Sequence, residues 1–278
     1  MQAMEKKEGI SIIGCGWYGL ELAKELISLG YVVKGSTTHI EKLNTLAEQG
    51  IKPYLLSFQT EQTYFPSDFF LTDILIICIP PTRIPGEVEK YAGKIKDIAR
   101  LAEINRIKKV LFISATSVYG DAGKVVDELS ETHPGTAAGK EILLAEQSLI
   151  NNPAFCTCIL RFSGLVGPNR HPGRFFAGKK NIPNGQCPVN LIHLDDCIGI
   201  TLKILKLNAF GYIFNASAPH HPEKQQFYTA AATALGMAPG EFVDELKEWK
   251  IISSIQIAQL LNYTFKIDNW VDWLRLPI

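Results

Sequence analysis

The stretch Ile10-Ser-Ile-Ile-Gly-Cys-Gly-Trp-Tyr-Gly19 decides how the rest of the chain is interpreted. It opens with an apolar, β-branched run, and a helical pattern of apolar residues follows its last glycine. This order is typical of a strand, a glycine turn and a helix. In such a turn Gly14 permits the bend, Gly16 lets a phosphate approach the backbone, and Gly19 lets the helix pack close to the strand.

The turn therefore predicts a dinucleotide site that acts through the backbone. The start of the following helix offers N–H groups and the positive end of a helix dipole to a pyrophosphate. The residues expected to bind the cofactor here are Gly14, Cys15, Gly16, Trp17, Tyr18 and Gly19. The alternative is that the glycines serve packing alone. The strand before the turn and the helix after it favour dinucleotide binding.

Composition narrows the class of protein. The 278 residues suit one large or two small domains, and 46% of them are hydrophobic. Equal numbers of basic and acidic residues, 28 of each, indicate neither a nucleic-acid partner nor an acidic disordered tract. The six cysteines include no CxxC pair, so we expect reduced, mostly buried thiols of a cytoplasmic protein rather than disulfides or a zinc site.

No membrane segment, signal peptide or metal site is expected. The longest apolar run, 74–79, is too short to span a bilayer, and residues 1–9 are polar and carry both charge signs. No cluster of residues has metal-ligand spacing. We therefore expect a cytoplasmic protein that acts on a small molecule, with no membrane partner, and we leave a homodimer open.

Strands and helices are expected to alternate after the glycine turn. We predict further strands at 31–36, 51–58, 73–79, 108–114, 155–162, 189–193 and 212–215. Predicted helices follow at 38–49, 87–104, 139–150 and from 194, and the chain from 222 onward is expected to be helical. This alternation predicts a Rossmann-type, doubly wound parallel sheet with its ligand crevice at the carboxyl ends of the strands.

Residues that follow the strands are the next candidates for cofactor binding. They are Ser36, Thr37 and Thr38 after the second strand, and Pro80 and Pro81 after the fourth. A site selective for NAD usually places an acidic residue about 20 residues after the glycines, on the ribose 2′-OH. The stretch 36–39 has no carboxylate. We therefore expect NADP to be accepted at least as well as NAD.

Five stretches together resemble the NAD-dependent epimerase/dehydratase family, the extended short-chain dehydrogenases/reductases. They are Gly14–Gly19, FISATSVYG at 112–120, RFSGLVGP at 161–168, IHLDD at 192–196 and YIFNA at 212–216. The resemblance implies about seven parallel strands and a small C-terminal lobe over the substrate. It assigns 9–165 plus about 189–217 to an NAD(P)-binding core, and 166–188 and 218–278 to a substrate-binding lobe.

The sequence departs from that family at catalytic positions. The family has a tyrosine, as general acid/base, four residues before a helix lysine; Lys140 fits the lysine, and the tyrosine position is Thr136. The family's serine or threonine, four residues before the tyrosine of Val-Tyr-Gly, corresponds to Ala115. An aliphatic hydroxyl has no pKa comparable with that of a phenol. The glycine spacing also differs from TGxxGxxG, the pattern of most of the extended family. Together these departures predict an atypical branch of that family.

Each remaining candidate for catalysis has a structural alternative. Lys140 is expected to hold the nicotinamide ribose, unless it is a solvated helix residue. Tyr119 is a candidate proton donor, unless its ring packs under the following loop. Thr116 and the adjacent Ser117 are candidates to orient a substrate, although turn capping is the commoner use of such hydroxyls.

The turn-rich loop at 164–173 and the strand after it add weaker candidates. Arg170, between Asn169 and His171, could pair with a substrate anion or be solvated. For His193, the sequence favours a strand-end histidine bonded to the backbone.

These features predict an NAD(P)-dependent oxidoreductase or epimerase that acts on a small polar or sugar-nucleotide-like substrate. The second hypothesis is a dinucleotide-binding sensor or scaffold without turnover, motivated by Thr136 and Ala115. The third is a hydroxyacid-type dehydrogenase, suggested by the glycine turn and the Pro80-Pro81 pair. That class predicts an all-helical C-terminal half, which the strands predicted at 155–162 and 212–215 oppose.

Overall fold

The structure is a computed structural model that describes residues 8–58, 66–82, 84 and 86–276. Its strands are β1 (Gly9–Ile13), β2 (Val32–Thr37), β3 (Lys52–Leu55), β4 (Ile74–Ile77), β5 (Lys109–Ala115), β6 (Lys124–Val126), β7 (Cys156–Phe162), β8 (Gly164–Val166), β9 (Leu191–His193), β10 (Ile213–Ala216) and β11 (Lys250–Ile252). Its helices are α1 (Trp17–Ser28), α2 (Leu43–Glu48), α3 (Tyr91–Ile104), α4 (Ala137–Ile150), α5 (Leu194–Leu207), α6 (Lys224–Ala234), α7 (Ile255–Leu261) and α8 (Trp270–Trp273). Short 3₁₀ turns are η1 (Ile40–Lys42), η2 (Ser67–Phe70), η3 (Val88–Lys90), η4 (Thr116–Val118) and η5 (Pro172–Arg174).

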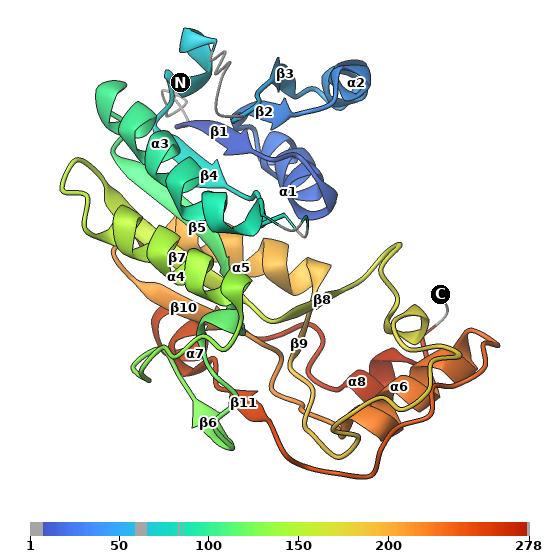
Figure 1. The fold of residues 1–278 in the computed structure, drawn as a ribbon. Helices are drawn as coiled ribbons and strands as arrows, with labels where there is room; N and C mark the ends of the chain where they lie inside the picture. The colour runs from blue at the N-terminus through green and yellow to red at the C-terminus, as the bar shows by residue number, and fades with distance from the viewer. Residues whose placement is uncertain (1–7, 59–65, 83, 85, 277–278) are drawn as a thin grey trace. The chain divides into compact units, whose positions relative to one another are not determined.

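A seven-stranded sheet is the centre of the fold (Figure 1), in the order β10-β7-β5-β4-β1-β2-β3. The pairs β1–β2, β1–β4, β2–β3 and β4–β5 are parallel. The chain winds in one direction from β1 to β3 and in the other from β4 onward. The predicted doubly wound Rossmann-type sheet is therefore confirmed. Its switch point lies between β1 and β4, where such sheets bind their ligands.

The chain divides into two compact units. Unit 1 comprises Met1–Ser114, Lys140–Leu160 and Asn208–Ile213, and unit 2 comprises Ala115–Gly139, Arg161–Leu207 and Phe214–Ile278. Strands β5, β7 and β10 begin in unit 1 and end in unit 2. The division into a cofactor core and a substrate lobe made from the sequence stays a prediction about function.

The inner strands of unit 1, β1 and β4, are apolar and covered on both faces. All four residues of β4 are buried, and α1 packs with Leu22, Ala23 and Leu26, which recur at helical spacing and are fully buried. Helices α3 and α4 lie side by side (Figure 1), and the Ala92 N–H donates to the Glu141 carboxylate at 2.9 Å.

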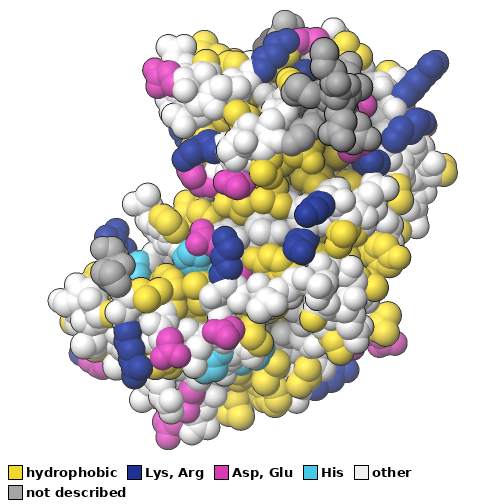
Figure 2. Space-filling view, turned by 180° about the vertical axis from the view of Figure 1, so that it is seen from behind, with side chains coloured by type: hydrophobic (Ala, Val, Ile, Leu, Met, Phe, Trp, Pro, Cys, Tyr) yellow, Lys and Arg dark blue, Asp and Glu magenta, His cyan; other side chains and the backbone are white. Residues whose placement is uncertain are grey.

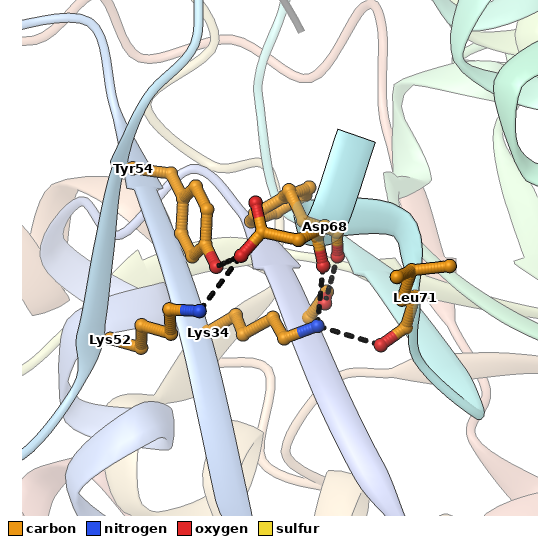
Figure 3. Close-up of polar contacts among 7 residues, drawn as sticks. Lys34, Lys52, Tyr54, Asp68 and Leu71 are labelled. Atoms are coloured by element: carbon orange, nitrogen blue, oxygen red, sulfur yellow. Dashed lines mark hydrogen bonds and ion pairs between the residues drawn. The ribbon is translucent and has the colours of Figure 1, made fainter. Parts of the chain in front are cut away.

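A polar cluster fixes the segment after residue 66 to the β2–β3 edge of the sheet (Figure 3). Lys34 of β2 donates to the carbonyl oxygens of Asp68, at 2.5 Å, and Leu71, at 2.6 Å. The Asp68 carboxylate accepts from Lys52 Nζ at 2.8 Å and from the Tyr54 hydroxyl at 2.5 Å. The Lys52–Asp68 pair is half-exposed, so its net contribution to stability is small, and the backbone contacts of Lys34 position the segment.

Unit 2 has its own core and two small parallel sheets, β6–β11 and β8–β9. The core cluster is Val166, Val189, Leu191, Ala218, Phe227, Tyr228 and Trp270. At the start of α5, the fully buried Asp196 carboxylate accepts from the Tyr263 hydroxyl and from the backbone N–H groups of Lys266 and Ile267, at 2.8, 2.7 and 3.1 Å. These bonds tie the chain after α7 to α5.

Several boundaries predicted from the sequence were wrong. The expected helix at 38–49 is a 3₁₀ turn followed by the short α2, and the expected strand at 51–58 is only β3. The segment after 222 is not all helical, because β11 pairs with β6. Strand β8 forms at the start of the loop expected at 164–173. Residues 1–7 of the polar N-terminal stretch lie outside the described residues.

The surface matches the balanced charge of the sequence. On the face in Figure 2, acidic and basic side chains are interspersed among apolar ones. Among the described helices, none combines the length and apolar character needed to cross a membrane.

Candidate functional site

The glycine loop follows β1 at the switch point of the sheet, and two of its glycines are required by the fold. Gly14 has a φ of +94°, which favours glycine, and a Cβ there would lie 2.9 Å from the Ile79 side chain. A Cβ on Gly19 would overlap the carbonyl oxygen of Gly14. These two residues therefore allow the bend and the close approach of α1, as the sequence predicted.

Gly16 is different, because the protein itself has no need of a glycine there. Its backbone is extended, with φ −88°, and a Cβ at this position would meet no atom within 4 Å. The residue is exposed and is the N-cap of α1, with no side-chain cap bond. The loop thus leaves open space beside its backbone at the positive end of a twelve-residue helix, and a pyrophosphate fits this arrangement.

The end of β2 holds the loop in place. The Ser36 hydroxyl accepts from the Gly14 N–H at 3.0 Å, and the Ser36 carbonyl accepts from the Cys15 N–H at 2.8 Å. Burial raises the pKa of the Cys15 thiol to about 12, so this thiol is unreactive at neutral pH. Of the other loop residues predicted to bind the cofactor, Tyr18 is buried and Trp17 is half-buried.

The residues after Ser36 form a turn that contains a carboxylate. The Thr37 hydroxyl accepts from the His39 N–H at 3.1 Å, and Thr38 is exposed. His39 Nδ1 lies 3.1 Å from the Glu41 carboxylate. Glu41 lies in η1, two residues beyond the stretch 36–39 considered from the sequence.

The positions after β4 lie on the other side of the switch point. Pro80 is exposed and Pro81 is half-buried. The Tyr91 hydroxyl donates to the carbonyl of Ile79 at 2.8 Å, which anchors the backbone just before the two prolines.

The two positions that match the family's tyrosine and lysine have distinct environments. The Thr136 hydroxyl accepts from the Gly139 N–H at 3.0 Å, which is the contact of a helix N-cap. This side chain therefore stabilises the start of α4. Lys140, in the first turn of α4, is exposed.

The Tyr119 phenol lies in a buried network of unit 2, with 1% of the residue exposed. Its oxygen accepts from Arg161 Nη1 at 2.6 Å and lies 2.8 Å from the Asp127 carbonyl and 3.0 Å from Asn215 Oδ1. Burial, more than any other cause, raises the pKa of Tyr119. This environment fits the packing alternative; its role as proton donor stays a prediction.

Thr116 and Ser117 line a cavity of about 400 Å³ within unit 2, named here the Thr116 cavity. The other lining residues are Asp121, Asn184, Cys187, Pro188, Asn190, Lys224, Glu248, Trp249 and Lys250. Lys250 Nζ donates to the Asp121 carboxylate at 2.7 Å, and Lys224 Nζ donates to the Pro183 carbonyl at 2.7 Å. The sequence analysis missed these two lysines, because isolated lysines in polar segments carry no local signal.

The loop after β8 is a turn. Arg170 Nε donates to the Leu165 carbonyl at 3.0 Å, and Asn169 has a φ of +60°. His193 Nδ1 accepts from the Asp195 N–H at 3.2 Å, so the predicted backbone-bonded histidine is confirmed. Among the described residues, no group of three or more His, Cys, Asp or Glu side chains could hold a metal ion.

Comparison with known proteins identifies the family of the chain. A search of protein-family models finds no match. Protein YeeZ of Escherichia coli K12 is 38% identical over 275 residues, which cover 97% of this chain and 98% of YeeZ. The chain belongs to the YeeZ family. That name states no activity, so the YeeZ family alone does not assign one.

Solved structures share the fold of this YeeZ-family chain. UDP-glucuronic acid 4-epimerase from Bacillus cereus, in complex with NAD, matches with a TM-score of 0.79 and 17% identity over 96% of each chain. A short-chain dehydrogenase/reductase superfamily protein from Agrobacterium tumefaciens, with bound NAD, matches with a TM-score of 0.77 and 17% identity over 95% of each chain. At this identity the likeness shows the fold.

Proposed function

We propose that the protein binds NAD(P) at its glycine loop and is an oxidoreductase or epimerase of the extended short-chain dehydrogenase type. The observation that carries the proposal is the open space beside the exposed backbone of Gly16, between two glycines that the fold itself requires. Packing accounts for Gly14 and Gly19. A ligand that approaches the backbone accounts for Gly16.

The residues proposed to hold the cofactor divide by role. The backbone of Gly14–Gly19 and the start of α1 bind the pyrophosphate, the turn Ser36–Thr38 lies by the adenosine ribose, and Pro80 and Pro81 border the crevice. Lys140 holds the nicotinamide ribose. The bound cofactor supplies hydride transfer; the protein supplies position and orientation.

The substrate is proposed to be small and polar, and sugar-nucleotide-like. The B. cereus structure is named as an epimerase of UDP-glucuronic acid, which supports this class. Within unit 2, the Thr116 cavity is lined by residues with hydroxyl, amide, ammonium and carboxylate groups, which suit a substrate with many hydroxyls. Thr116 and Ser117 are proposed to orient the substrate there.

The proton-transfer step is proposed to be slow. The Thr136 hydroxyl accepts a hydrogen bond from the helix backbone, and an aliphatic hydroxyl does not ionise near neutral pH. A general acid/base contributes about 10²–10⁴-fold to a rate. We therefore expect dinucleotide binding with slow turnover, in which a proton moves through water or through Tyr119.

The alternative is a dinucleotide-binding sensor or scaffold without turnover. Two observations favour it: Thr136 serves as a helix cap, and the Tyr119 phenol is held by three polar partners in a buried network. Both hypotheses predict dinucleotide binding, and only turnover separates them.

The decisive experiment is calorimetric titration of the purified protein with NAD and NADP, before and after Gly16→Val. We expect the variant to stay folded and to lose at least about tenfold in affinity, because the side chain occupies the phosphate space. Gly93→Val is the matched control: its Cβ also meets no atom within 4 Å, but it lies in α3 and not in the loop. A folded Gly16→Val protein that binds dinucleotide as tightly as the parent overturns the proposal.

Turnover then separates the enzyme from the sensor. Sugar nucleotides are incubated with the protein and each cofactor, and the absorbance of reduced nicotinamide, together with chromatography for epimers, is followed. Product above the cofactor-free blank supports the enzyme, and its absence from a protein that binds cofactor supports the sensor.

Three further proposals concern context. NADP is proposed to be accepted at least as well as NAD; an affinity for NAD at least tenfold tighter than for NADP would contradict this.

The six free cysteines support a reducing compartment, the cytoplasm. A homodimer is proposed on the sequence expectation alone, and light scattering tests it.

A further inference from the structure

Unit 2 contains a second cavity, of about 380 Å³, which the proposed function does not use. It is lined by residues between 167 and 174, by His193 at the end of β9, by Leu235, and by Trp273, Leu274 and Leu276, and we name it the Trp273 cavity. Its volume lies in the range of small-molecule sites. None of its ten described lining residues is acidic.

Two histidines line this cavity, and each accepts a backbone hydrogen bond with the same ring nitrogen, Nδ1. His171 Nδ1 accepts from the Gly173 N–H at 3.1 Å, and His193 Nδ1 accepts from the Asp195 N–H at 3.2 Å. A ring nitrogen that accepts from a backbone N–H carries no proton, so the neutral ring carries its proton on Nε2. Both rings line the cavity, and no described residue bonds either Nε2.

Trp273 fixes the orientation of both rings. Its indole stacks on His171 with centroids 5.5 Å apart and a 23° tilt, and it meets His193 edge-on at 5.6 Å. His193 is only 8% exposed, so little of its ring is open to water, and a ligand that enters the cavity can supply an acceptor to its Nε2–H. A donor held in place in this way is prepared for a ligand before the ligand arrives.

The remaining lining separates into a charged rim and an apolar wall. Arg174 is exposed at the rim, and Leu235 and Leu274 contribute apolar surface beside Trp273. The Thr116 cavity differs, because its lysines bond to neighbouring oxygens of the protein itself. In the Trp273 cavity the donors have no such partners among the described residues.

We propose that the Trp273 cavity binds a small apolar carboxylate, an aromatic or branched aliphatic acid. The carboxylate accepts from His193 Nε2–H and His171 Nε2–H and pairs with the Arg174 guanidinium. The apolar body packs on Trp273 and Leu274. This site is independent of dinucleotide binding.

The charge of the cavity favours a carboxylate over a phosphate. Burial, the largest cause in each case, lowers the pKa of both histidines, so the rings are neutral at pH 7. Arg174 is then the one charged residue among the described lining residues, and its positive charge complements a monoanion. The Asp195 carboxylate lies 3.7 Å from His193 Nδ1 and is not part of that lining. Its planar fork also matches the two oxygens of a carboxylate.

The test is calorimetric titration of the whole protein with phenylacetate and isocaproate, each beside its uncharged amide, and with phenyl phosphate. We expect the acids to bind more tightly than the amides and than phenyl phosphate. Arg174→Gln is expected to weaken phenylacetate binding about tenfold and to leave phenylacetamide binding unchanged, because a charged hydrogen bond is lost. Arg275→Gln is the matched control; it removes the same exposed charge from a residue that does not line the cavity.

A second variant tests the buried donor. His193→Phe keeps an aromatic ring in place and is expected to weaken the acid and the amide alike; circular dichroism confirms its fold. The proposal is overturned if no acid binds at about 10 mM, if amide or phosphate binds as tightly as acid, or if folded Arg174→Gln binds phenylacetate as the parent does. Titration with NAD(P) is scored separately, so failure of the dinucleotide site leaves this result unaffected.

Discussion

The glycine loop of unit 1 and the Trp273 cavity of unit 2 are proposed to present donors to a ligand in opposite ways. The loop uses the backbone of six consecutive residues, and its glycines act by lacking a side chain. The cavity uses the side chains of His171, His193 and Trp273, which are brought together only by tertiary folding. A backbone site can be recognised from a short stretch of sequence, whereas a side-chain site of this kind cannot.

The largest effect on stability is expected from a substitution at Gly19. Gly19→Ala places a Cβ against the Gly14 carbonyl oxygen, which is backbone and cannot rotate away. We expect the free energy of unfolding to fall by about 3 kcal/mol, as for severe overpacking. Urea unfolding followed by circular dichroism measures the change.

Gly93→Ala is the control, because this exposed helix position has open space for a methyl group. It is expected to raise stability by about 0.5–1 kcal/mol, since alanine is the better helix former. Equal stability of Gly19→Ala and the parent would mean that α1 moves freely against β1, and the distinction between Gly19 and Gly16 would fail.

The central sheet could be predicted because its inner strands β1 and β4 are apolar runs, and helical patterns separate its strands in the sequence. Strands β8 and β11 could not, because each has three residues and depends on a distant partner; Lys250 pairs with Lys124. At the site, the position of the glycine turn follows from local spacing. From the sequence, His193 was expected to bond to the backbone, and His171 was named only as a neighbour of Arg170. Their common contact with Trp273, about 80 residues away from His193 along the chain, is set by tertiary folding.

A smaller effect is expected at Thr136, where the question is whether a side chain serves the fold or the chemistry. Thr136→Ala removes the cap contact to Gly139, so we expect a loss of about 1 kcal/mol in thermal or urea unfolding. Any turnover should stay nearly unchanged. Thr136→Asn, which can still cap the helix, is the control. A collapse of turnover in both variants, with cofactor binding retained, would instead assign the hydroxyl to proton transfer.

The smallest expected effect is on the pH dependence of stability, which distinguishes the two regions. Burial lowers the pKa of His171 and His193 below the unfolded value of about 6.5, so the unfolded chain binds more protons in acid. Their contribution to stability is present above that value and is lost as the pH falls through the folded pKa. The glycine loop has no such group.

We therefore expect the melting temperature to decline between about pH 7 and pH 5 and the decline to be shallower in His193→Phe. Calorimetric scans at several pH values measure it. His133→Gln, which changes an exposed histidine, should leave the slope unchanged. A slope that is identical in the parent and in His193→Phe would exclude a contribution from His193.

The parallel pairing of β6 with β11 has a consequence for the order in which the chain matures. Residues 124–126 pair with the strand at 250–252, so the pair cannot form until residues 250–252 have been synthesised. Contacts so distant in sequence form slowly, because the chain loses the conformational entropy of a long loop before the contacts stabilise it. Unit 1, whose last segment ends at Ile213, can mature earlier on the ribosome. A nascent chain halted shortly after Ile213 would thus carry a finished glycine loop beside an unfinished unit 2.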